Sequence, residues 1–210
     1  MSIAILTTQS RQPTLRMGVT MAGLRPHVML VERLPGEDDS LDACVERVRD
    51  SAVIIVRFRN LWQAMTEVRH RQRELGFGAL HCLDLVGHGE PGALSVGDAL
   101  LSGDVQTQRV LAQVLNPPAL VDPATVLRLL GCGVGVGGLS ADLPLGAEGD
   151  GPLLALALKR RLGCRVQVTL RGVDPHDFKV SGFATNESLA EAVDVERCGL
   201  VPVTAFPTLP

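Results

Sequence analysis

Hydrophobic and polar positions along the chain follow two periods, one typical of strands and one typical of helices. Short runs rich in β-branched residues predict buried strands, whereas apolar residues at i, i+3, i+4 and i+7 predict helices. The predicted strands are 27–34, 51–58, 79–86, 125–130 and 164–170, and the predicted helices are 41–48, 61–75, 104–115 and 152–162. Strands that alternate with helices in this way predict an α/β fold, a three-layer sandwich around a mainly parallel sheet.

Turn and cap residues divide this pattern into elements without indicating a linker between domains. Gly76 and Gly163 are expected to end two of the helices, and Asp150 with Pro152 to begin the second. Gly97-Asp98 predicts a hairpin within 93–101. We therefore expect one domain, 1–210, with 1–24 as an N-terminal extension or edge hairpin and 135–150 as a flexible loop. The pattern weakens beyond residue 174, and the role of 175–210 stays open.

Composition excludes several classes of function. Apolar residues make up 46% of the 210 residues and the formal net charge is −3, so no basic field favours nucleic acid or an anionic membrane surface. Aromatic residues are 3% of the chain, too few for a base-stacking surface. The longest aliphatic run, 153–158, is far shorter than the roughly 20 residues of a transmembrane helix. With an odd number of cysteines, five, and no signal-peptide pattern, we expect free thiols and a cytoplasmic protein.

The chemistry-bearing residues follow two of the predicted strands. Strand 79–86 runs into Gly87-His88-Gly89, and strand 125–130 runs into Gly131-Cys132-Gly133. In parallel sheets, ligands bind at the carboxyl ends of the strands. If these two strands are neighbours, His88 could take the proton of the Cys132 thiol and return it to a leaving amine. The amides of Gly89 and Cys132 would then serve as an oxyanion hole.

Simpler interpretations exist for each of these residues separately. A His-Gly or a Cys-Gly pair after a strand is also an ordinary turn, and only their joint occurrence favours a site. Asp84, four residues before His88, could orient the imidazole, but a hydrogen-bonded strand aspartate is the simpler interpretation.

The blocks LDLVGHGEPGALSVG and TVLRLLGCGVG resemble the caspase-like cysteine peptidases, the group of caspases, metacaspases, legumain, clostripain and separase, and most of all bacterial caspase-like domains of uncertain function. The residues that carry the resemblance are His88, Gly89, Pro91, Gly92, Leu94, Val96, Gly97, Gly131, Cys132, Val134, Gly151, Leu154 and Leu158. The resemblance covers roughly 79–172.

This resemblance implies a caspase-like fold and a cysteine endopeptidase, with self-processing as one of its uses, that acts on a protein or peptide substrate. It implies His88 as the general base and acid, Cys132 as the nucleophile and the Gly89 amide in the oxyanion hole. Cys132 does not lie in the Q-A-C-x-G string of caspases, so aspartate specificity does not carry over. Asp174, where some members keep pocket residues, would favour a basic substrate side chain.

Three alternatives remain open from the sequence. The first is a caspase-like module that no longer cleaves and serves as a scaffold or binding subunit. The second is a nucleotide site at Gly133, Gly135 and Gly138, which match G-x-G-x-x-G but lack a helix directly after them. The third is a zinc site that combines His81 and Cys82 with the residues of the dyad, without the paired spacing of known zinc motifs. We expect no metal and no cofactor, and the sequence does not indicate an oligomeric state.

Overall fold

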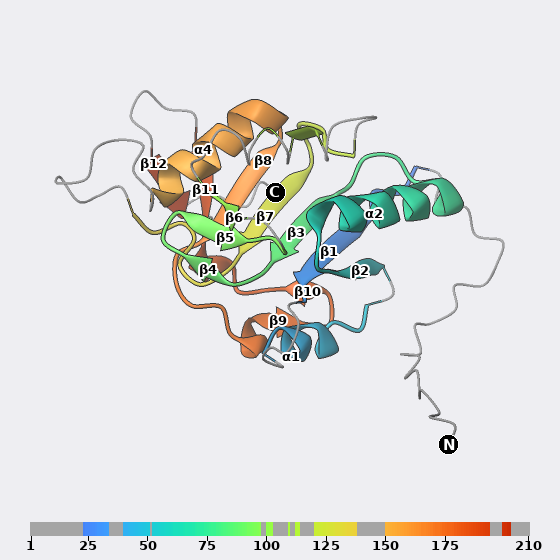
Figure 1. Ribbon diagram of the computed structural model, residues 1–210, viewed down its shortest axis with the longest axis horizontal. Coiled ribbons are helices and arrows are strands. Elements are labelled where there is room, and N and C mark those ends of the chain that lie inside the picture. Colours follow the sequence, from blue (N-terminus) through green and yellow to red (C-terminus); the bar gives the residue numbers. More distant parts are fainter. Residues whose placement is uncertain are drawn as a thin grey trace, which may run out of the picture.

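The computed structural model describes residues 23–33, 40–50, 52–97, 100–102, 109, 112–113, 120–137, 150–193 and 199–202. These residues form an α/β fold around one large sheet (Figure 1). Its strands are β1 (His27–Glu32), β2 (Val53–Phe58), β3 (Cys82–Val86), β7 (Val126–Leu130), β8 (Arg165–Thr169), β11 (Leu189–Val193) and β12 (Gly199–Pro202).

The seven strands lie in the order β12-β11-β8-β7-β3-β1-β2. All pairs from β2 to β8 are parallel, whereas β11 pairs antiparallel with β8 and with β12. The sheet is therefore mainly parallel, as the alternating pattern predicts, and its five predicted strands are confirmed. The last two strands were not predicted, because the pattern beyond residue 174 is weak.

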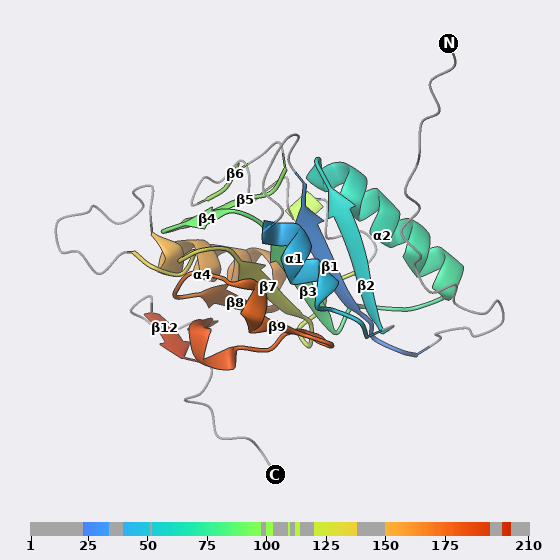
Figure 2. The same ribbon diagram turned by 90° about the horizontal axis from the view of Figure 1, so that it is seen from below.

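Helices and a small hairpin cover the two faces of the sheet, which makes three layers (Figures 1 and 2). The helices α2 (Leu61–Leu75) and α4 (Gly151–Leu162) pack on one face, in a core with the leucines and valines of β1, β3, β7 and β8. The other face packs against α1 (Ser40–Glu46) and the hairpin of β9 (Phe178–Lys179) and β10 (Gly182–Phe183).

The observed ends of α2 and α4 agree with the predicted cap residues. Gly76 and Gly163 both have left-handed backbone, with φ of 70° and 67°, and they end the two helices. The Asp150 side chain accepts a hydrogen bond from the amide of Leu153 at the start of α4. Most of the predicted helix 104–115, of 1–24 and of 135–150 lies outside the described residues; residues 109, 112 and 113 of the predicted helix are described and are helical.

A second, three-stranded sheet lies beyond the carboxyl ends of β3 and β7 (Figure 2). It consists of β4 (Gly89–Glu90), β5 (Ala93–Ser95) and β6 (Leu100–Leu101), in that order. The pairing of β5 with β6 confirms the hairpin predicted around Gly97-Asp98. The short β4 was not predicted, and it places Gly89 in a strand.

A buried ionic network ties the central strands together. Asp84 of β3 is fully buried and pairs in register with Arg128 of β7, whose Nε and Nη2 donate to its two oxygens at 2.6 and 2.7 Å. The His27 ring of β1 lies 2.7 Å from the same carboxylate, and Arg128 also donates to the carbonyl of Phe183. Burial favours the protonated carboxyl, but the charges of Arg128 and His27 outweigh it and hold the pKa of Asp84 below its usual value.

Replacing Asp84 by Asn should lower the free energy of unfolding by about 3–5 kcal/mol, because it leaves the Arg128 charge buried without its counter-ion. Urea unfolding at pH 7 measures this. Asp42→Asn is the matched control, since Asp42 pairs with Arg57 at the surface and its loss should cost less than about 1 kcal/mol.

The same network predicts a pH dependence of that difference. Because the pKa of Asp84 is lowered in the folded state, its contribution is full at pH values above its unfolded pKa of about 4. The difference between the native protein and Asp84→Asn should shrink as the pH falls below that value. Equal losses in the Asp84 and Asp42 variants at pH 7 would contradict the role of the network.

Candidate active site

The carboxyl ends of β3 and β7 lie next to each other in the sheet. Val86 pairs with Leu130, and the amide of Gly87 extends the ladder by donating to the carbonyl of Leu130 at 3.2 Å. His88 and Cys132 each follow two positions after this last pair, so the strands deliver them to equivalent positions at one edge. Both residues are exposed. The expectation that the two strands are neighbours, on which the dyad depends, is therefore confirmed.

Two glycines let the turns after β3 and β7 touch. A Cβ added to Gly89 would lie 2.6 Å from the nitrogen of Cys132 and 2.6 Å from the carbonyl carbon of Gly131. A Cβ added to Gly131 would lie 2.9 Å from the Cα of Gly89. No side chain fits at such distances, so only glycine permits this backbone contact. The contact brings the main chain that follows His88 directly against the amide of Cys132.

The Gly89 amide points away from the strand that pairs with β4. Gly89 lies opposite Leu94, and Ser95 donates to the carbonyl of His88 at 2.7 Å. In an antiparallel ladder this makes Gly89 and Leu94 a pair without mutual hydrogen bonds, so the Gly89 N–H faces the open side of β4. A donor on that side is available to a ligand at this edge.

The Cys132 amide lies where the ladder between β3 and β7 stops. Continuing the parallel pattern would have it donate to the carbonyl of Gly87, and that hydrogen bond is not formed between these described residues. Two other amides of the turn have acceptors, since Gly133 donates to the main-chain carbonyl of Arg171 and Gly135 donates to that of Thr169. The backbone segments that carry the amides of Gly89 and Cys132, the predicted oxyanion donors, therefore pack against each other at one edge.

A buried carboxylate, Glu32, holds the His88 turn in place. Glu32 ends β1, beside β3, and its side chain is 2% exposed. It accepts hydrogen bonds from the amides of His88 and Gly97, at 3.3 and 2.8 Å, and from the hydroxyl of Ser95. These bonds tie the second sheet and the His88 turn to the end of the central sheet.

Sequence reasoning treated Glu32 only as part of a strand and missed this role. The available signal was a carboxylate at the end of the apolar run HVMLVE. A buried carboxylate needs donors, and the glycine-rich turn after β3 offers them as backbone amides.

Cys132 differs from the other described cysteines in its exposure. Cys44, Cys82 and Cys164 are buried, whereas Cys132 is exposed. Burial raises the pKa of Cys44 to about 12 and that of Cys164 to about 11, and it also raises the pKa of the Cys82 thiol. Because the thiolate is the reactive form of cysteine, these three thiols are poor nucleophiles.

Asp84 does not orient the His88 ring. Its two oxygens accept from Arg128 and contact His27, so the simpler interpretation of Asp84, a hydrogen-bonded strand aspartate, is confirmed. His27, Cys82 and Asp84 have ligand atoms within 4.8 Å of one another. The Arg128 guanidinium bonds both Asp84 oxygens, and this positive charge disfavours a cation there.

The zinc alternative finds no support in the positions of its residues. Cys82 begins β3 and His88 follows its end, so the strand separates them. Because β3 and β7 are parallel, Cys132 follows the carboxyl end of β7, whereas His81 and Cys82 lie at the start of β3.

Asp174 lies in the loop that follows β8, directly before a short 3₁₀ helix. Its carboxylate accepts hydrogen bonds from the amide of His176 at 2.7 Å and contacts the ring of His176 at 2.6 Å. The hydrogen bond from the His176 amide is the main cause that lowers the pKa of Asp174. Asp174 thus caps the short 3₁₀ helix η1 (Pro175–Asp177). Its role in a substrate pocket stays a prediction.

Comparison with protein-family models, with curated proteins and with solved structures finds no match for this chain. What the structure defines is an α/β protein with an imidazole and an exposed thiol at the ends of adjacent parallel strands. Among the described residues, no helix is both long and apolar enough to cross a bilayer.

Iodoacetamide should alkylate Cys132 well before Cys44, Cys82 and Cys164 in the folded protein, because those three are buried and their pKa values are raised. Peptide mapping by mass spectrometry after timed labelling at pH 7.5 measures the order. Unfolding in urea should make the rates similar. Similar rates already in the folded protein would contradict the assignment of Cys132 as the accessible thiol.

Replacing Glu32 by Ala should lower the free energy of unfolding by roughly 2–4 kcal/mol, because it strips the acceptor from the amides of His88 and Gly97. Urea unfolding followed by circular dichroism measures the loss. Glu74→Ala, on the exposed surface of α2, is the control and should change stability by no more than about 0.5 kcal/mol. A loss in the Glu32 variant as small as in the control would show that the carboxylate does not hold the turn.

Proposed function

We propose that this chain is a caspase-like cysteine endopeptidase whose catalytic dyad is His88 and Cys132. The single observation that supports it best is the register of β3 and β7, which brings an exposed imidazole and an exposed thiol to one edge of the sheet. The resemblance of the blocks around both residues to caspase-like peptidases adds to this support. Geometry and sequence thus favour the same two residues.

In this mechanism His88 accepts the proton of the Cys132 thiol, and the thiolate attacks the carbonyl carbon of a peptide bond. The carbonyl oxygen becomes an oxyanion, which accepts hydrogen bonds from the amides of Gly89 and Cys132 in this proposal. The C–N bond breaks, His88 gives its proton to the departing amine, and a thioester to Cys132 remains. Water, deprotonated by His88, then hydrolyses the thioester and releases the acid and the free thiol.

In this proposal an extended substrate lies along the second sheet. β4 forms one edge of that sheet, and its open side carries the Gly89 amide. A peptide that runs along this side would present a carbonyl to the same amide that the mechanism uses. This arrangement favours a protein or peptide substrate.

The scaffold alternative shares every feature of the fold, and only reactivity separates it from the peptidase. The nucleotide alternative is less well supported. The Gly133 and Gly135 amides already donate to carbonyls, and the Asp150 carboxylate caps the start of α4, where a phosphate would need free donors.

Cys132→Ala should abolish cleavage of a fluorogenic tetrapeptide library that varies the residue before the scissile bond, and His88→Ala should lower kcat/KM by about 10²–10⁴-fold. His81→Ala is the matched control, because His81 is also exposed but precedes the start of β3. It should leave the rate unchanged.

Covalent trapping separates the peptidase from the scaffold. Peptidyl acyloxymethyl ketones that alkylate Cys132 in the native protein, and fail to do so in His88→Ala, would support the dyad. Native protein that neither cleaves the library nor reacts with these ketones would overturn the proposed peptidase in favour of the scaffold.

A further inference from the structure

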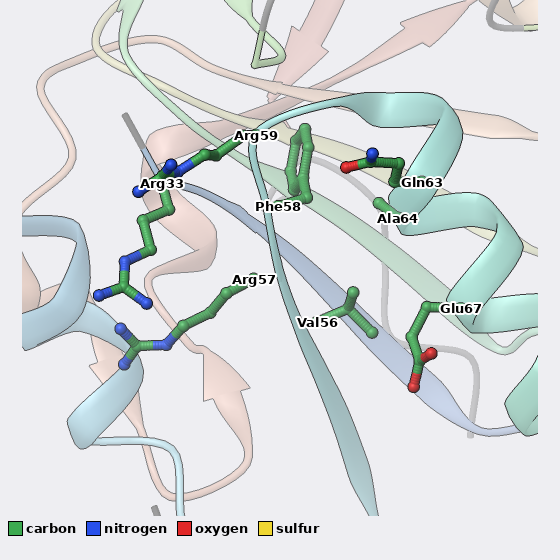
Figure 3. A pocket seen from close by; sticks show the side chains of 8 residues that line it. All are labelled: Arg33, Val56, Arg57, Phe58, Arg59, Gln63, Ala64 and Glu67. Carbon is green, nitrogen blue, oxygen red and sulfur yellow. The ribbon is translucent and has the colours of Figure 1, made fainter. Parts of the chain in front are cut away.

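The edge strand β2 carries a surface that the peptidase chemistry does not use. β2 is the last strand of the seven-stranded sheet on its side, and among the described residues only β1 pairs with it. A hollow of about 500 Å³ lies along this edge, between β2 and α2 (Figure 3). We define the β2 edge as the main chain of Ile55 and Arg57 together with the side chains of Arg33, Arg57 and Arg59.

Among the described residues, no strand pairs with the outward main chain of the β2 edge. The amide of Arg33 donates to the carbonyl of Phe58 at 2.7 Å, so the main-chain N–H and C=O groups of Phe58 point toward β1. Hydrogen-bonding direction alternates along a strand, so Ile55 and Arg57 direct their N–H and C=O groups outward. An outward ladder of this kind is a template for another strand.

The side chains of the β2 edge are strongly basic. Arg33, Arg57 and Arg59 are exposed and line the hollow, and Figure 3 shows them on one side of β2. Val56 and Phe58 lie on the other side, toward α2. Among the described residues, Glu67 pairs with Arg71, and Asp42 pairs at the surface with Arg57, so an incoming carboxylate exchanges with Asp42 at Arg57.

The spacing of these side chains defines the ligand. Arg57 and Arg59 are two residues apart, and residues two apart on an added strand also share a face. A strand added beside β2 would place alternate side chains next to the arginines and the intervening ones next to Val56 and Phe58. We propose that the β2 edge binds an extended peptide with acidic residues at alternate positions and apolar residues between them, by addition of that peptide as an eighth strand.

The test uses fluorescence anisotropy with the probe fluorescein-Val-Asp-Val-Asp-Val-amide and the Cys132→Ala protein, so that cleavage cannot consume the probe. Binding is therefore measured independently of the proposed peptidase activity. The Asn-for-Asp peptide should bind at least about tenfold more weakly, and added salt should weaken the Asp peptide.

The matched variants separate this edge from general charge attraction. The double variant Arg57→Glu/Arg59→Glu should bind the probe at least about tenfold more weakly. Arg160→Glu/Arg161→Glu makes the same charge change at the exposed end of α4 and should have little effect. Equal weakening by both double variants, or no binding of the probe, would overturn the proposal.

Strand addition is tested separately from charge. N-methylation of alternate residues of the probe blocks one set of its amides at a time. Only methylation of the amides that face β2 should abolish binding. In the protein, Ile55→Pro removes an outward N–H without removing a hydrogen bond to β1, so it should weaken the probe while unfolding in urea stays cooperative. If the two N-methylated peptides bind equally well, the peptide does not add as a strand, and the proposal is wrong.

Discussion

The register between β3 and β7 is the constraint on which the candidate site depends. Asp84 pairs with Arg128, Val86 pairs with Leu130, and His88 and Cys132 follow at the next equivalent positions. A shift of one residue would separate the buried carboxylate from its arginine and leave the Arg128 charge without its counter-ion, which the interior does not tolerate. The ion pair in the middle of the strands therefore helps to set which two residues follow at equivalent positions beyond their ends.

Beyond the strands, backbone contacts rather than side chains build the edge. Gly89 and Gly131 allow the two turns to touch, and Glu32 fastens the His88 turn to the end of β1. The Gly89 amide is left facing outward by the ladder of β4 and β5. The register and these contacts thus bring the turns that carry His88, Gly89 and Cys132 to one edge of the sheet. The opposite side of the sheet ends in β2, whose open ladder and arginines form a separate surface.

Much of this could be predicted from local patterns. The strands that end before His88 and Cys132 are short apolar runs bounded by glycine, and the caps at Gly76, Asp150 and Gly163 have the conformations or hydrogen bonds expected of them. β4 could not be predicted, because a strand of two residues exists only through its pairing with β5. The same holds for the role of Asp84, since a single aspartate in a strand gives no sign of the arginine that it meets.

By itself, the sequence determined the alternation of strands and helices, the helix ends and the two glycine-flanked residues with reactive side chains, because these depend on residues close together in the chain. Only the tertiary structure decided that β3 and β7 are neighbours, that Glu32 reaches the His88 turn and that β2 lies at the edge. Strand order and buried hydrogen bonds join residues far apart in sequence, and periodicity carries no information about which of them pair.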